Sequence, residues 1–302
     1  MRRDVEFKSQ GTICRGWFYT PDTGTANKRF PTIVMAHGFS AVKEMRLDRF
    51  AEAFAAAGMA SLVFDYRGFG TSDGEPDGEP RQDIDPFAQI ADYRNAISYA
   101  RALPEVERER IGIWGSSYSG GHVLVVGALD RRVKAVVSQV PLIDAWESLG
   151  SMLGVEVRTA MVQQLIDERE RLYAGAAPLT MPVVGAAGAA AALPGDEAWE
   201  WFQLAAKTAP TWKNEITLRS MERLLEYAPG RYIDRIAPTA LLMIVAERDF
   251  LPVDIASRAF AYAGEPKRLC MLPVGHFAPY EPPHFATASR EAVEWFRRHL
   301  CA

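Results

Sequence analysis

Short apolar runs alternate with amphipathic stretches along most of the chain. The runs at 31–37, 60–68 and 110–115 are apolar over most of their length, which is typical of strands buried on both faces of a parallel sheet. Residues 46–57 and 86–103 lie between them and have helical periodicity. This order of strands and helices predicts βαβ units, with helices on both faces of the sheet. The series resumes with strands at 133–141, 239–247 and 267–274 and helices at 253–263 and 286–300.

Two parts of the chain do not follow this alternation of strands and helices, one near the N-terminus and one in the second half. Residues 4–9 and 12–20 have strand-like composition and are separated by Gln10-Gly11, which predicts an antiparallel hairpin. Residues 142–234 read as helical and aromatic, with no buried strand. We therefore expect one α/β core, formed by residues 1–141 and 235–302, and a helical insertion formed by residues 142–234.

Composition excludes several classes of protein. The 302 residues are 48% hydrophobic and 24% charged, as in ordinary globular proteins, and the net charge of −4 gives no reason to expect nucleic acid as a partner. No apolar stretch follows the N-terminal arginines, so no secretory signal is expected. The Ala/Gly-rich segment 181–195 is shorter than the roughly 20 residues that span a bilayer, and we expect a loop or a small-residue helix against a pocket. Three widely spaced cysteines fit a reducing cytoplasm better than a disulfide framework.

The segment "RIGIWGSSYSGG" (110–121) is the strongest chemical signal. A serine on a sharp strand-to-helix turn is lifted above the sheet, and the following helix directs its free N–H groups at the site. The pattern small–x–Ser–x–small makes Ser117 the candidate nucleophile. A phosphate-binding turn is the alternative, but the segment lacks the lysine of a P-loop and the G-x-G-x-x-G spacing.

With this motif in its strand–turn–helix context, the chain resembles the α/β-hydrolases over nearly its whole length. The motif is most similar to that of the dienelactone hydrolase and X-Pro dipeptidyl-peptidase (cocaine-esterase-like) branches, where a tyrosine often follows the nucleophile. The resemblance implies the α/β-hydrolase fold, a mostly parallel sheet flanked by helices. Ser119 stands where these families usually have a second glycine, and a serine is small enough to keep the turn.

A serine nucleophile needs a base, and the base needs a carboxylate that orients it. In α/β-hydrolases the acid and then the histidine follow the serine along the chain. Asp249, just after a predicted buried strand, is the expected acid, with Glu247 and Asp254 as alternatives. His276, directly after the last predicted strand, is the expected base, with His284 as the alternative.

The resemblance also implies where the oxyanion donors lie. They are the backbone N–H groups of Tyr118, next to the nucleophile, and of Phe39, in the loop after strand 31–37. His37 is expected to brace that loop. His122, on the helix after Ser117, is expected to pack in the core.

Together these residues favour a serine hydrolase of carboxylic esters, lactones or thioesters that works through an acyl-enzyme on Ser117. An acyltransferase, a hydrolase of C–C or peptide bonds, and a non-catalytic small-molecule receptor remain alternatives. No cofactor and no metal are expected, because the histidines lack ligand spacing. The expected partner is a small, hydrophobic acyl substrate; no membrane partner is expected, and a homodimer is left open.

The insertion is expected to fold over the nucleophile, because α/β sheets bind ligands outside the carboxyl ends of their strands. An apolar lid would enclose the acyl group and exclude water. The alternative is that its large side chains form the lid's own core. The candidates for lining a substrate pocket are Trp146, Met152, Leu153 and Trp212.

Overall fold

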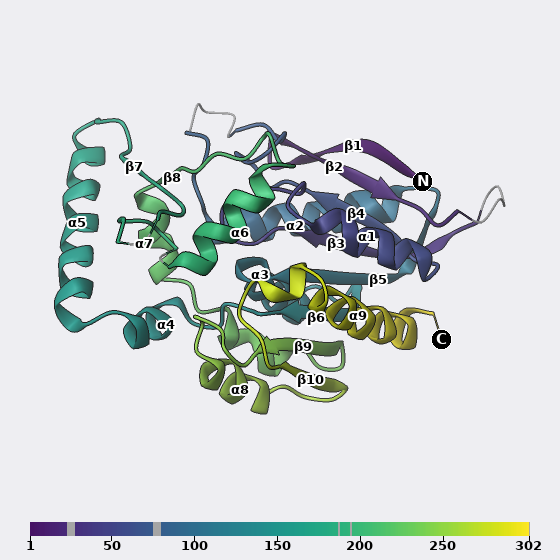
Figure 1. The fold of residues 1–302 in the computed structure, drawn as a ribbon. Helices are drawn as coiled ribbons and strands as arrows, with labels where there is room; N and C mark the ends of the chain where they lie inside the picture. Colours follow the sequence, from purple (N-terminus) through teal and green to yellow (C-terminus); the bar gives the residue numbers. More distant parts are fainter. Residues whose placement is uncertain (23–27, 75–79, 187, 194, 302) are drawn as a thin grey trace.

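The computed structural model describes residues 1–22, 28–74, 80–186, 188–193 and 195–301. They form an eight-stranded sheet in the order β1-β2-β4-β3-β5-β6-β9-β10 (Figure 1). Strands β3 to β6, β9 and β10 are parallel, and β2 joins the sheet antiparallel to both β1 and β4. The fold is the expected α/β-hydrolase fold. The strands are β1 Arg2–Ser9, β2 Thr12–Tyr19, β3 Phe30–Ala36, β4 Ala60–Phe64, β5 Val106–Ser116, β6 Val133–Gln139, β9 Ala240–Ala246 and β10 Lys267–Leu272.

Helices cover both faces of the sheet, as the alternating pattern predicted. Two of them pack together on one face, and another pair packs on the other face beside β5, the strand that leads to Ser117. The first pair is α1 (Leu47–Ala56) and α9 (His284–Leu300); the second is α2 (Pro86–Ala102) and α3 (Tyr118–Leu129). Helix α8 (Val253–Ala261) packs on β9, beside the 3-10 helix η1 (Pro229–Arg235).

Local sequence explains several of the element boundaries. Gln10 and Gly11 both have positive φ, 50° and 94°, which is the twist of a tight hairpin between β1 and β2. Gly58 ends the turn after α1 with a φ of 86°, a conformation that glycine adopts without strain. The Asp85 side chain accepts from the N–H groups of Phe87 and Ala88 and so caps α2.

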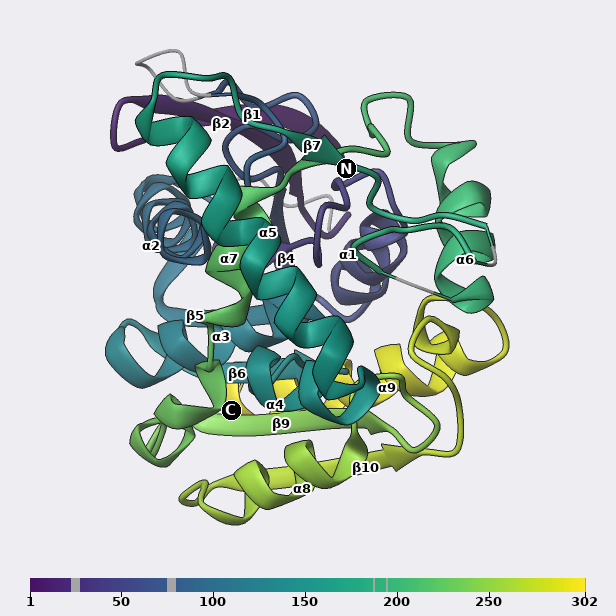
Figure 2. The ribbon, with the colours of Figure 1, turned by 90° about the vertical axis from the view of Figure 1, so that its left-hand side faces the viewer.

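Residues 142–234 depart from the rest of the fold. Its described residues contain four α-helices, most of the 3-10 helix η1, and a two-stranded antiparallel sheet. The sequence did not predict this sheet because each strand has two residues. Helix α5 packs on α4 and α7 and lies apart from the sheet, at the left of Figure 1; Figure 2 looks onto this end of the molecule. The elements are α4 Ala145–Met152, α5 Val155–Tyr173, β7 Thr180–Met181, α6 Asp196–Ala206, β8 Ile216–Thr217 and α7 Arg219–Leu225.

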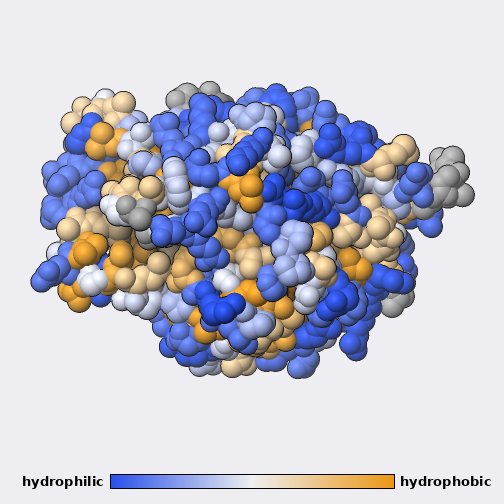
Figure 3. All heavy atoms as spheres, viewed as in Figure 1, coloured by the Kyte–Doolittle hydropathy of each residue, from blue (hydrophilic) through white to orange (hydrophobic). Residues whose placement is uncertain are grey.

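The surface of this end carries exposed apolar side chains. Trp146, Val155 and Val157 of α4 and α5 are 48%, 69% and 55% exposed. Figure 3 shows apolar residues over this end and along the middle of the same face, with polar residues over most of the remainder. Within the described residues, no helix is long and apolar enough to cross a membrane.

Candidate active site

Ser117 sits on the strained turn between β5 and α3. Its φ of 60° and ψ of −119° lie outside the usual regions for a residue with a side chain, at a cost of about 1–3 kcal/mol. Gly115 makes the turn feasible, because a β-carbon there would lie 2.2 Å from the carbonyl oxygen of Ser119. Ser119, in place of the usual glycine, is fully buried, and its hydroxyl lies 3.0 Å from that of Tyr66. The turn therefore keeps its geometry with serine at this position.

The structure brings Ser117, His276 and Asp249 into one hydrogen-bonded chain. Ser117 Oγ lies 2.9 Å from His276 Nε2, and His276 Nδ1 lies 2.8 and 2.9 Å from the two carboxylate oxygens of Asp249. Because a carboxylate only accepts, Nδ1 carries the proton and Nε2 is free to accept the proton of the serine hydroxyl. The N–H of Leu251 donates to Asp249 at 2.8 Å and fixes the carboxylate. The alternative His284 is exposed at the start of α9.

The two expected oxyanion donors are held in place through their own peptide groups. His37 Nδ1 donates to the Gly38 carbonyl at 3.0 Å, and that carbonyl shares a peptide plane with the N–H of Phe39. The Ser117 carbonyl accepts from the N–H groups of Gly121 and Leu142 at 3.2 and 3.0 Å, and it shares a peptide plane with the N–H of Tyr118. Within the described part of the chain, neither donor N–H has a hydrogen-bond acceptor. Both are therefore available to an anionic oxygen.

A buried ion pair anchors the loop that carries Phe39. Lys43 Nζ lies 2.5 Å from Asp65 Oδ2, and the Lys43 N–H donates to Asp65 Oδ1 at 2.7 Å. The two side chains are 4% and 0% exposed. Asp65 also accepts from the N–H and the hydroxyl of Thr71, at 3.0 and 3.2 Å. The turn after β4 thus fixes the loop after β3.

Two other histidines near the site are structural. Burial lowers the pKa of His37, and its Nε2 accepts from the N–H of Tyr66. Burial, with a smaller effect of His37, lowers the pKa of His122 to about 3. His122 bonds to the Tyr227 hydroxyl at 2.8 Å and to the Gln89 side chain at 3.0 Å. Both imidazoles are neutral at neutral pH, and each has its two nitrogens engaged in hydrogen bonds.

A small cavity lies beside Ser117 and His276. Its volume is about 20 Å³, room for about one water molecule, and its walls are mostly apolar. A larger open groove of about 640 Å³ runs beside Trp17 and Lys43, but it contains neither Ser117 nor His276. The small cavity is lined by His37, Gly38, Phe39, Ala41, Met45, Leu47, Ser117, Leu193, Trp201, Phe202, His276, Phe277 and Tyr280.

The four residues predicted to line a substrate pocket do not contact this cavity, as far as the described residues define it. Trp146, on α4, is half exposed and lies 5.8 Å from the Arg158 guanidinium. Met152 and Leu153 end the same helix and are partly exposed. Trp212 lies behind Phe202, at 5.3 Å between ring centres. The helices α4 and α5 lie to one side, which is why their apolar residues miss the site.

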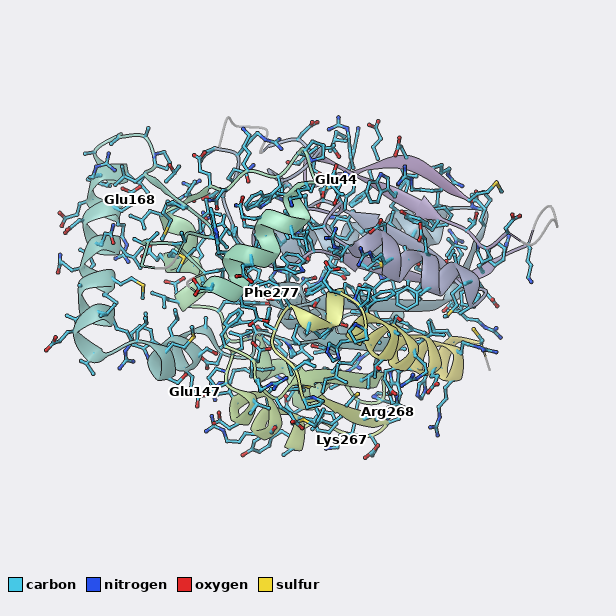
Figure 4. The ribbon with its side chains drawn as sticks, viewed as in Figure 1. Glu44, Glu147, Glu168, Lys267, Arg268 and Phe277 are labelled. Carbon is cyan, nitrogen blue, oxygen red and sulfur yellow. The ribbon has the colours of Figure 1, made fainter. Side chains whose placement is uncertain are left out.

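Helix α6 and the loop before it supply the cavity wall instead. Trp201 and Phe202 come from α6, and Leu193 from the Ala/Gly-rich segment. The sequence shows an aromatic cluster here, but it gives no sign of which aromatic residues face Ser117. Figure 4 shows the difference in position: Glu168 marks α5 at the edge of the molecule, whereas Phe277 lies near the centre below α6.

Hydrogen bonds join this segment to two loops, the one that carries Phe39 and the one that carries His276. Trp212 Nε1 donates to the Ser40 carbonyl at 3.1 Å, in the loop that carries Phe39. The Glu197 carboxylate accepts from the N–H of Phe277 at 3.2 Å, next to His276. The cavity is therefore closed by a segment that bonds to the loop carrying Phe39 and to the loop carrying His276. Among the described residues, no group of three His, Cys, Asp or Glu side chains could hold a metal ion.

Comparison with known proteins places this arrangement in a family. Residues 17–225 match the X-Pro dipeptidyl-peptidase (S15) family. The chain is an α/β-hydrolase of the X-Pro dipeptidyl-peptidase (S15) family. Members of this family are hydrolases, so this protein is a hydrolase enzyme.

The sequence similarity to known relatives covers most of this chain. The quorum-quenching protein AidA of Acinetobacter baumannii is 33% identical, over 98% of this chain and 94% of that protein. The thiohydrolase aneE of Aspergillus aculeatus is 33% identical, over 82% of this chain and 76% of that protein. The crystal structure of the α/β hydrolase GrgF from Penicillium superposes with a TM-score of 0.83 at 27% identity and covers 100% of both chains.

Proposed function

We propose that the protein cleaves carboxylic esters, thioesters or lactones through an acyl-enzyme on Ser117. The observation that carries this proposal is the hydrogen-bonded chain from Asp249 through His276 to Ser117 on a strained turn. Two backbone N–H groups at the site, of Phe39 and Tyr118, have no acceptor among the described residues. A serine hydroxyl is a weak nucleophile, and this arrangement gives it a base in the required tautomer.

The proposed reaction runs in two halves. Ser117 Oγ attacks the carbonyl carbon while its proton passes to His276 Nε2, and Asp249 stabilises the imidazolium through Nδ1. The carbonyl oxygen becomes an anion and accepts from the N–H groups of Phe39 and Tyr118. The leaving alcohol or thiol takes the proton from Nε2. Water then attacks the acyl-enzyme with the same base and releases the acid.

The cavity favours an uncharged acyl group over an N-terminal dipeptide. Among the described lining residues there is no carboxylate, so the ammonium group of a dipeptide substrate would be buried without a partner. Relatives named as thiohydrolases, and the relative grgF named as a polyketide transferase, favour a thioester among the candidate bonds. Leu193 and the α6 residues Trp201 and Phe202 act as the lid in this proposal, and they must move for substrate to enter a space of about 20 Å³.

Acyl transfer is a second candidate because the closed cavity has room for only about one water molecule. An acyl-enzyme protected by Leu193, Trp201 and Phe202 would survive until an acceptor enters. Adding a small alcohol to the hydrolysis assay separates the two candidates. A transferase gives mainly the alkyl ester, whereas a hydrolase gives mainly the free acid.

The proposed function is tested by labelling and activity together. A fluorophosphonate should form one adduct, on Ser117, and Ser117→Ala should abolish both the adduct and the hydrolysis of p-nitrophenyl and thioester substrates. Ser119→Ala serves as the control, because its hydroxyl bonds to Tyr66 rather than to His276. An adduct on Ser116 or Ser119, located by peptide mass spectrometry, would contradict the assignment.

A further inference from the structure

The indole of Trp201 carries a buried N–H group with no acceptor. Trp201 is 8% exposed, and its Nε1 makes no hydrogen bond within the described part of the chain. Buried polar groups are almost always paired, and an unpaired one calls for an explanation. The indole N–H groups of Trp114 and Trp295 are unpaired as well, but neither side chain lines the cavity beside Ser117.

Aromatic neighbours hold the Trp201 ring in its position on the cavity wall. The ring stacks on Phe277, with 4.9 Å between ring centres and 23° between planes. Phe202 and Tyr280 pack against it at 5.0 and 5.1 Å. The Tyr280 hydroxyl donates to Ser116 Oγ at 2.5 Å, so it is already engaged. The indole is therefore fixed by contacts that leave its single donor unused.

Trp212 offers a direct comparison within the same segment. Its ring packs on Phe202, one residue from Trp201, but its Nε1 donates to the Ser40 carbonyl. One indole of this aromatic layer thus has a protein acceptor. The other has none within the described part of the chain, and its side chain forms part of the wall of the cavity beside Ser117. The acceptor that Trp201 lacks can enter that cavity as part of a substrate.

We propose that Trp201 Nε1 donates a hydrogen bond to an oxygen atom within the acyl chain and so determines specificity. The preferred substrates are then oxoacyl or hydroxyacyl thioesters and esters rather than plain alkanoyl ones. An alkanoyl chain that binds along this wall after the segment has opened would leave the buried donor unpaired, which is the basis of discrimination by a polar group. This inference rests on the proposed acyl-enzyme chemistry at Ser117.

The experiment compares N-acetylcysteamine thioesters of octanoic, 3-oxooctanoic and 5-oxooctanoic acids. The native enzyme should cleave at least one oxo substrate with a kcat/KM about tenfold above that of octanoyl, the effect of one neutral hydrogen bond. Trp201→Phe keeps an aromatic ring without the N–H. This variant should bring the ratio of kcat/KM between the oxo and octanoyl substrates close to one. It should do so because kcat/KM falls more for the oxo substrate than for octanoyl.

Trp212→Phe is the matched control, because its N–H is committed to Ser40. It should change the rates for all three substrates by one common factor. The inference is overturned if the native enzyme shows no preference for the oxo substrates, or if the preference survives in Trp201→Phe. A water molecule bound permanently to Trp201 Nε1 would lead to the absence of any preference. Fluorophosphonate labelling of Ser117 shows whether each variant is folded. If the native enzyme neither labels nor cleaves any thioester, the proposed function itself fails.

Discussion

Removing the ammonium group of Lys43 should damage both stability and catalysis. Lys43→Met keeps much of the aliphatic length but leaves the Asp65 carboxylate, which is 0% exposed, without its counter-charge. Breaking a buried pair by deleting one partner costs about 3–5 kcal/mol. Asp65 would keep its bonds to the N–H groups of Lys43 and Thr71, so we expect the lower end, about 3 kcal/mol. This is a large share of the roughly 5–15 kcal/mol that stabilises a typical protein.

The same change loosens the loop that carries Phe39. Loss of one oxyanion donor costs about 100-fold to 1,000-fold in kcat, and a displaced donor should cost less, about tenfold. Urea unfolding gives the stability loss, and ester hydrolysis gives kcat and KM on the same preparation. KM should change little, because Lys43 does not line the cavity.

An exposed ion pair provides the control for this prediction. Arg258 and Glu147 also form an ion pair, but they are 58% and 47% exposed. Arg258→Met should leave both the urea midpoint and kcat unchanged, because solvent screens such pairs. If Lys43→Met costs less than about 1 kcal/mol, the ion pair does not anchor the loop as described here.

Three further changes test other parts of the site. Gly115→Ala should abolish phosphonate labelling while the helical circular dichroism persists, since the new methyl group would meet the Ser119 carbonyl oxygen at 2.2 Å. Asp249→Asn should lower kcat by orders of magnitude with little change in KM, because it favours the wrong tautomer of His276. Burial lowers the pKa of His122 to about 3, so between pH 6.5 and 3 this imidazole is protonated in the unfolded chain but not in the folded one. The free energy of unfolding should therefore decrease as the pH is lowered through this range, by at most about 1.4 kcal/mol per pH unit. His122→Gln should flatten that slope in urea titrations at several pH values, and an unchanged slope would contradict a neutral buried imidazole.

The sheet and its helices could be predicted from local patterns. Buried parallel strands such as β3 and β9 are continuous apolar runs in which every residue is buried, and this pattern needs no tertiary information. The prediction of Asp249 and His276 as partners of Ser117 combined two things: the order serine, acid, histidine, which the resemblance to α/β-hydrolases implies, and the places of these residues just after predicted strands. Parallel strands deliver their carboxyl ends to one edge, so residues far apart in sequence meet there.

The cavity wall could not be predicted in the same way. Trp146 and Trp201 both lie on short amphipathic helices of the insertion, and composition alone does not say which helix docks over the serine. Docking depends on single long-range contacts, such as Glu197 with the N–H of Phe277 and Trp212 with Ser40. Helix α4 makes no comparable contact with either loop in the described structure, and its tryptophan stays half exposed.

The direct pairing of β6 with β9 allows the insertion and the sheet to change independently in evolution. These strands are neighbours in the sheet, in register from Ala135 with Ala240 to Gln139 with Ile244, although the whole insertion lies between them in sequence. Substitutions, additions or deletions in the insertion can therefore accumulate without shifting the ladder that aligns the reacting groups. Under the proposed function, changes in the segment that carries Leu193 and α6 should alter which acyl chain is accepted while Ser117, Asp249 and His276 persist. We expect a swap of residues 182–212 between relatives to transfer part of the selectivity.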